Sequence, residues 1–159
     1  MKIASAAIIV LAAFVATSCT AKRIPGIGIS LADTPDNRAV VKLMDEYRDA
    51  VEHKDIDRLL AMASKKFYED SGTPETDDDY GYDGLKEHFT KHFKQIKKLQ
   101  LNIQLKKVNI KDSKAKVDYR YVTRYLMDLP SGQKWQVTDE LNRLELVKEQ
   151  GKWKVLSGF

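Results

Sequence analysis

The sequence predicts an α+β domain in which three N-terminal helices pack on a curved antiparallel sheet. Two observations support this prediction. Apolar residues recur at helical spacing as far as about residue 96, and after Lys98 the apolar period changes to two. Helices followed by a run of strands, with no internal repeat, are typical of an α+β layout.

The first two helices have recognisable starts. Thr34-Pro35-Asp36 combines a capping hydroxyl, a proline in the first turn and an acid at the positive end of the helix dipole. The helix is expected to run to about His53, and Asp55 then caps a second, short helix. The apolar positions of the first helix are Val40, Leu43, Met44, Tyr47, Ala50 and Val51.

The next elements are a brief strand and a third helix. Phe67-Tyr68 predicts the strand, and an acidic loop broken by glycines and Pro74 follows it. The third helix is expected over about 82–96. Its apolar stripe consists of Leu85, Phe89, Phe93 and Ile96.

The remaining chain predicts three long strands and a short one, joined by turns at 112–114, 130–132 and 150–151. Alternation from Leu99 to Leu105 slips in phase to Val108, which indicates a β-bulge. Alternation from Trp135 to Leu141 slips again to Leu144. Bulges in long strands would curl the sheet around the helices.

The N-terminus predicts export. Ile3 to Val15 is an apolar run too short to span a membrane, and small residues separate it from Cys19, the only cysteine. This pattern resembles the lipobox of bacterial lipoproteins, with Ala16 where that family prefers Leu or Val. The resemblance implies that residues 1–18 are a signal peptide, and that Cys19 is lipidated and anchors the protein in a membrane. Thr20 is not aspartate, which by analogy with enteric sorting favours the outer over the inner membrane.

Residues 19–33 are expected to be the lipidated cysteine and a flexible tether, and residues 34–159 the folded domain. Pro25, Gly26 and Gly28 lie in the tether.

The chain has a net charge of +4, unevenly spread. Seven acids and no base lie over 69–83, and ten lysines against two acids lie over 86–116. We interpret the lysines as a solvated helix face and strand edge, with an anionic lipid or acidic partner as the alternative. Nucleic acid is not expected, because no aromatic residues are interleaved with the lysines.

The order of elements resembles the cone-shaped superfamily of nuclear transport factor 2, ketosteroid isomerase, scytalone dehydratase and the polyketide cyclases (the SnoaL-like group). The resemblance covers about 36–159. It rests on four short motifs, which are YRDAVEHKDID from Tyr47, FYEDSG from Phe67, Tyr82-Asp83-Gly84 and GKWKV from Gly151. It implies that the sheet curls into an open, cystatin-like cone, and that the helices and the open end of the cone enclose a pocket.

Two positions resemble the ketosteroid isomerases more closely. Tyr47 matches the tyrosine that donates to the dienolate oxygen, and Asp70 matches the aspartate that shuttles the proton. A carboxylate in an apolar cleft is a better base, and a tyrosine hydroxyl opposite it stabilises an oxyanion. The third element, a protonated acid, is replaced by Arg143, with Asn142 one residue away.

Other residues are pocket candidates on chemistry alone. His92 lies inside the apolar arc of the third helix, with His88 at its edge, and is interpreted as a core or pocket histidine. Three tyrosines share one strand face, which suits a flat or amphipathic ligand. No cofactor is expected, and no metal, because two imidazoles are too few for a zinc site. The candidate pocket set is Tyr47, Asp70, His92, Tyr119, Tyr121, Tyr125, Trp135 and Asn142.

Three hypotheses follow for function. The first is a non-enzymatic envelope lipoprotein whose cone binds a small apolar or amphipathic ligand, or a partner protein. The second is an isomerase, dehydratase or cyclase with Asp70 as base, Tyr47 as electrophile and His92 as second acid. The third is a structural module that forms a homodimer through its sheet.

Overall fold

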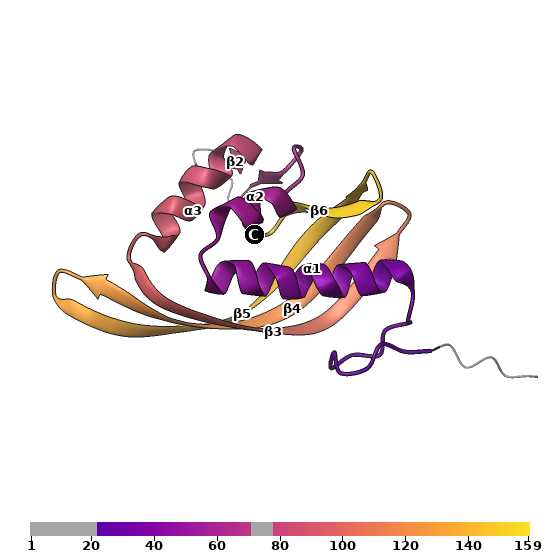
Figure 1. Ribbon diagram of the computed structural model, residues 1–159, viewed down its shortest axis with the longest axis horizontal. Helices are drawn as coiled ribbons and strands as arrows, with labels where there is room; N and C mark the ends of the chain where they lie inside the picture. Colours follow the sequence, from indigo (N-terminus) through magenta and orange to yellow (C-terminus); the bar gives the residue numbers. More distant parts are fainter. Residues whose placement is uncertain (1–21, 71–77) are drawn as a thin grey trace, which may run out of the picture.

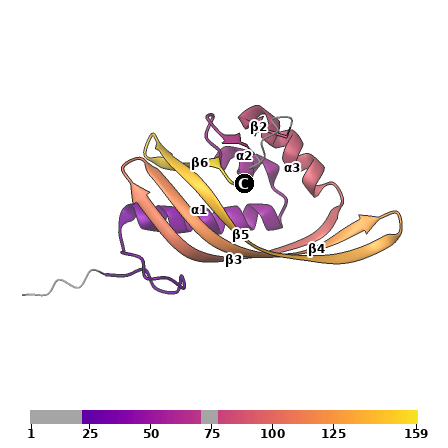
Figure 2. The same ribbon diagram turned by 180° about the vertical axis from the view of Figure 1, so that it is seen from behind.

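The structure is a computed structural model that describes residues 22–70 and 78–159. Cys19 and the predicted signal peptide lie outside the described residues. Three helices lie on the concave face of a curved antiparallel sheet, as the sequence predicts (Figures 1 and 2). Among the helices of the described residues, none is long and apolar enough to cross a membrane.

Helices α1 (Pro35–Glu52) and α2 (Ile56–Met62) begin at the predicted caps. Thr34 Oγ1 accepts from the Asn37 N–H at 3.2 Å, and Asp55 Oδ1 accepts from the Arg58 N–H at 3.0 Å. Each bond satisfies a backbone donor that the first helical turn leaves without a partner. The predicted apolar stripe of α1 is buried except for Val51, which is partly buried, and it packs on the sheet.

The third helix is shorter than predicted. Tyr82–Gly84 is a 3-10 turn, η1, and α3 spans Leu85–Phe93. Ile96 does not extend the helix but begins strand β3, where its side chain is still buried. An isolated apolar residue fits either a helical or an alternating period, so the sequence does not fix this boundary. Strands β1 (Tyr68–Glu69) and β2 (Tyr80–Gly81) form a separate small antiparallel sheet.

The main sheet has the order β3-β4-β5-β6. Its strands are β3 (Ile96–Lys111), β4 (Lys114–Leu129), β5 (Gly132–Glu149) and β6 (Lys152–Ser157). The predicted bulge in β3 is present, as a register shift between Leu105 and Lys107. The β4–β5 ladder is continuous, but β5 shifts register against β6 between Glu145 and Leu146, close to the second predicted phase slip. Trp135, Val137 and Leu141 face outward and are exposed.

Residues 22–33, predicted as part of a flexible tether, form a closed loop beside α1 (Figure 1). The Ile24 N–H donates to the Leu31 carbonyl at 2.9 Å, and the Asp33 N–H donates to the Lys22 carbonyl at 2.8 Å. Leu31 is buried. The chain can reverse here because Gly26 and Gly28 adopt positive φ angles of 76° and 75°, which cost glycine little.

Candidate functional site in the cone

A cavity of about 190 Å³ lies between the helices and the concave face of the sheet. Helices α1 and α3 form one wall, strands β3 and β4 the other, and the end of the chain lies across it (Figure 2). We call it the cone cavity. It is lined by Tyr47, Val51, His88, Phe89, His92, Phe93, Leu99, Leu101, Tyr119, Tyr121, Thr123, Asn142 and Phe159. Most of this wall is apolar, as expected for a small-molecule pocket.

A short hydrogen-bond relay forms the polar part of the cavity. Tyr119 and Asn142 are directly opposite each other in the β4–β5 ladder. Asn142 Nδ2 donates to Tyr119 Oη at 3.1 Å and to the Gly158 carbonyl at 3.2 Å. The hydroxyls of Tyr119 and Tyr47 are hydrogen-bonded in turn. Because Tyr119 Oη accepts from Asn142, its own proton is available to Tyr47, and the Tyr47 proton is then available to a ligand oxygen.

Burial keeps this relay neutral. It raises the pKa of Tyr47 above the ordinary value of 10, and the hydrogen bond from Tyr119 only partly opposes this. Burial also raises the pKa of Tyr119, strengthened by the neighbouring Tyr47. Both hydroxyls therefore stay protonated through the physiological range. Tyr47 can act as a donor in this cavity, and it is poorly suited to act as a base.

The rim of the cavity holds the ionisable side chains. Tyr121 Oη donates to Glu140 Oε2 at 2.8 Å, and burial followed by this carboxylate raises the pKa of Tyr121 to about 12. His88 and His92 lie one turn apart on α3 with parallel rings, 6.3 Å between centroids. Tyr80 stacks on His88 at 4.5 Å. Partial burial lowers the pKa of His88 below its ordinary value, and the charge of His92 adds to this.

The last two residues cover the cavity. The ring of Phe159 packs against those of Tyr47, Phe67 and Phe89, with centroids 5.5 to 5.6 Å apart. The Gly158 N–H donates to Glu69 Oε2 at 2.6 Å. Gly158 has a φ of 89°, and a Cβ there would lie 2.0 Å from the Arg143 carbonyl oxygen, so only glycine fits.

The structure brings together five of the eight residues that the sequence singled out for the pocket. Tyr47, Tyr119, Tyr121 and Asn142 line the cone cavity, and His92 lies at its rim with an exposed side chain, not inside the apolar arc. The relay between Tyr47 and Asn142 joins a helix to a strand almost a hundred residues later in the chain.

The other three lie elsewhere, for geometric reasons. Asp70 is exposed at the end of β1 and is not among the described residues that line the cavity. Tyr125 is on the concave face, but it lies two residues further along β4 than Thr123 and does not line the cavity. Trp135 pairs with Leu126 in the β4–β5 ladder, which places it on the opposite, convex face, where it is 54% exposed. Lipidation at Cys19 falls outside the described residues.

Sequence reasoning missed Phe159 and Glu69. Phe159 closes the cavity, and Glu69 holds the backbone of its neighbour. The only local signal was a glycine before a terminal aromatic residue, which does not by itself say where the ring packs. Arg143 occupies the position where the ketosteroid isomerases have a protonated acid. It lies on the convex face, where its Nε donates to Asp118 Oδ1 at 2.6 Å.

The cavity has few groups for acid–base chemistry. Among the described residues that line it there is no carboxylate, and its titratable groups are tyrosines and the two rim histidines. No cluster of three or more metal-ligating side chains occurs in the described part of the chain. The arrangement provides apolar walls, hydroxyl donors that include Tyr47 and Thr123, and a histidine pair at the entrance.

Comparison with known proteins places the fold. No family model matches the sequence, and no match was found among curated proteins. Among solved structures, a scytalone dehydratase-like protein from Novosphingobium aromaticivorans is similar with a TM-score of 0.67 and 13% identity, over 77% of this chain and 80% of that one. A ketosteroid isomerase-like protein from Erwinia carotovora gives a TM-score of 0.62 and 17% identity, over 77% and 92%.

A nuclear transport factor 2-like superfamily protein from Salmonella enterica gives a TM-score of 0.62 and 13% identity, over 76% of this chain and 89% of that one. The fold is therefore the nuclear transport factor 2-like cone that the sequence resembles. At these identities the similarity shows the fold alone. Enzyme-like proteins and proteins of unknown function share this fold, so the activity has to be argued from the cavity.

Proposed function

We propose that this protein is an envelope lipoprotein that binds a small apolar or amphipathic ligand in the cone cavity without transforming it. The observation that supports binding is the combination of aromatic walls with a neutral donor, Tyr47, held by Tyr119 and Asn142. Pockets for drug-sized ligands are usually 300–1,000 Å³. A cavity of about 190 Å³ favours a smaller ligand, on the scale of one or two aromatic rings.

The same cavity argues against proton shuttling by a carboxylate. The alternative, an isomerase or dehydratase, needs a base near the donor. Asp70 is exposed and outside the described lining, the Glu140 carboxylate lies outside that lining and already accepts from Tyr121, and the histidines are at the rim. This second function therefore depends on His88 or His92 as the base. It predicts turnover that His92→Gln abolishes, whereas a binding protein releases its ligand unchanged.

A titration tests the binding proposal. 2-Naphthol is a planar two-ring phenol whose oxygen can accept from Tyr47, and it suits the size of the cavity. We expect isothermal titration calorimetry to show one binding site on the wild-type protein. Thr123→Trp should abolish binding, because Thr123 lines the cavity and an indole would fill it. Circular dichroism establishes that this variant is folded. Equal binding by both proteins would place the ligand elsewhere.

For the anchor we propose lipidation of Cys19, on the strength of the sequence pattern. Two or three acyl chains anchor a protein durably, unlike a single myristoyl chain. We expect metabolic labelling with palmitate, globomycin-sensitive processing and recovery in the outer membrane fraction. Cys19→Ala should remove the label. Unlabelled full-length protein in the soluble periplasmic fraction would contradict the anchor and leave the cavity proposal standing.

A second copy of the chain is the partner we propose for the convex face of the sheet. Trp135, Val137 and Leu141 are 54%, 63% and 74% exposed on one face of β5. The ion pair Arg120–Asp139 lies within this row, between Val137 and Leu141, and Arg143–Asp118 lies beyond its end. Apolar side chains framed by both signs of charge can complement themselves across a two-fold axis.

A further inference from the structure

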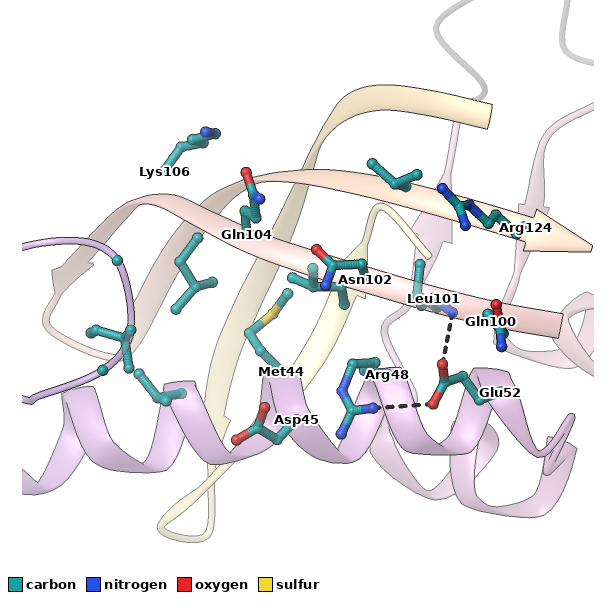
Figure 3. A pocket seen from close by; sticks show the side chains of 17 residues that line it. Met44, Asp45, Arg48, Glu52, Gln100, Leu101, Asn102, Gln104, Lys106 and Arg124 are labelled. Carbon is teal, nitrogen blue, oxygen red and sulfur yellow. Dashed lines mark hydrogen bonds and ion pairs between the residues drawn. The ribbon is translucent and has the colours of Figure 1, made fainter. Parts of the chain in front are cut away.

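A second hollow, of about 1060 Å³, follows the free edge of β3 (Figure 3). It lies between α1, the edge of β3 and the loop that contains Gly26 and Gly28. We call it the edge groove. Figure 3 shows Met44, Arg48 and Glu52 on the α1 side and a row of polar side chains on β3, namely Gln100, Asn102 and Gln104.

The main chain of β3 is open towards this groove. β3 is the first strand of the sheet, so it pairs with β4 on one side only. The Leu101 N–H points away from β4 and donates to Glu52 Oε1 at 2.8 Å. In an antiparallel ladder every second residue faces the same way, so the N–H and C=O groups of Ile103 and Leu105 face the groove too.

Helix α1 covers only the first part of this edge. Lys54 Nζ donates to the Ile96 carbonyl at 2.7 Å, and Glu52 takes the Leu101 N–H. Beyond Leu101, no side chain of the described residues donates to or accepts from the β3 main chain on the groove side. An open stretch of this kind is a template for pairing with another strand.

The charge along the groove is positive. β3 contains five lysines and no acid over Ile96–Lys111. Lys106 of β3 and Arg124 of β4 line the groove, and neither forms an ion pair with a described residue. The nearby acid Glu52 is already paired with Arg48 at 3.0 Å, which leaves Asp45 as the other lining acid. An incoming strand with acidic side chains would meet these cations.

We propose that the edge groove binds an extended acidic segment of a partner protein, which pairs with β3 beyond Leu101 as an added strand. The main-chain groups of Ile103 and Leu105 give affinity, and Lys106 and Arg124 select acidic side chains. Recognition by strand addition is a general mode that needs an exposed sheet edge with a groove beside it. This site is separate in function from the cone cavity, and either can fail without the other.

The test uses the full-length protein, purified in a mild non-ionic detergent, and a fluorescein-labelled peptide of alternating glutamate and valine. Binding is followed by anisotropy, and backbone amide shifts locate the site. We expect the shifts to centre on Ile103 and Leu105. Lys106→Glu with Arg124→Glu should weaken binding about tenfold or more, and high salt should weaken it too. Lys152→Glu, an equally exposed lysine at the start of β6, is the matched control and should bind as the wild type does.

Two further probes separate strand pairing from charge alone. The same peptide N-methylated at alternate residues keeps its charge but loses the donors that pair with β3, so it should not bind. Vesicles of phosphatidylglycerol with phosphatidylcholine test the alternative, a lipid surface. Equal binding of the methylated peptide would overturn the proposal. Failure of the unmodified peptide to bind at millimolar concentration would also overturn it. A third contrary result would be that vesicles bind, that the double variant removes this vesicle binding, and that the peptide does not bind.

Discussion

The Tyr47 hydroxyl, which lines the cone cavity and is hydrogen-bonded to Tyr119, is the donor that we assign to the ligand. Tyr47→Phe keeps the ring on α1 and removes this donor. A net hydrogen bond contributes about 0.5–1.5 kcal/mol, so affinity for 2-naphthol should fall about 2- to 12-fold. Calorimetric titration measures this. Tyr125→Phe, on the same sheet face but outside the cavity lining, is the control and should leave affinity unchanged.

Gly158 shows how a single backbone position holds the end of the chain. Gly158→Ala should lower the free energy of unfolding by about 1–3 kcal/mol, because the new Cβ meets the Arg143 carbonyl at a positive φ. Urea denaturation measures this. Gly151→Ala is a matched control, since φ is 78° there and nothing lies within 4 Å of an added Cβ. Similar losses in both variants would show that the collision with Arg143 is unimportant.

The residue scale also marks a limit of sequence reasoning. Tyr47 and Tyr119 could be chosen from the sequence because a tyrosine on an apolar face is visible in the pattern. Asn142 lies one residue from the position where the ketosteroid isomerases place a protonated acid, and the register shows why it belongs to the cavity, since it lies opposite Tyr119. Phe159 could not be chosen, because its ring position depends on long-range contacts with Phe67 and Phe89.

At the scale of elements, α3 makes the fold sensitive to acid. Burial lowers the pKa of His88, so the folded state favours the neutral ring. The unfolded chain takes up this proton below about pH 6.5. The contribution of neutral His88 to the free energy of unfolding is therefore fully present above that pH, and it is lost as the pH falls. Urea unfolding from pH 7.5 to 5.5 should show a decline that His88→Gln reduces. Thr90→Ala, at an exposed and non-titrating position of the same helix, should not reduce it.

The apolar period and the capping residues were enough to predict which segments are helices and which are strands. They predicted the ends of these elements less accurately. The caps Thr34 and Asp55 are local signals, and both hold. The end of α3 and the outward direction of Trp135 are set by the sheet, since Ile96 joins β3 and Trp135 pairs with Leu126. An alternating pattern gives the period of a strand but does not say which face is buried.

At the scale of the whole molecule, the convex face predicts self-association. We expect sedimentation velocity in mild detergent at micromolar concentration to show a dimer, and Leu141→Lys to shift it to a monomer by placing a charge at the most exposed of these apolar positions. Lys134→Glu, at an exposed polar position of the same strand, should leave the dimer intact. A wild-type protein that stays monomeric would remove the second copy from the proposal.

The two hollows divide the molecule into a concave interior and an edge. The cone cavity is small and mostly apolar, whereas the edge groove is larger and combines apolar with polar and charged side chains. A small ligand and a protein segment could thus be bound at once. Because α1 contributes Tyr47 to the first and Arg48 and Glu52 to the second, both sites depend on the correct seating of this helix.

Native mass spectrometry of the protein gently purified from its membrane tests the central claim most directly, because the cell then supplies the ligand. If the cone cavity binds a small apolar or amphipathic molecule, the wild-type spectrum contains a bound mass that is absent from folded Thr123→Trp. A wild-type spectrum without any bound mass, or the same adduct on both proteins, would contradict binding in the cone cavity.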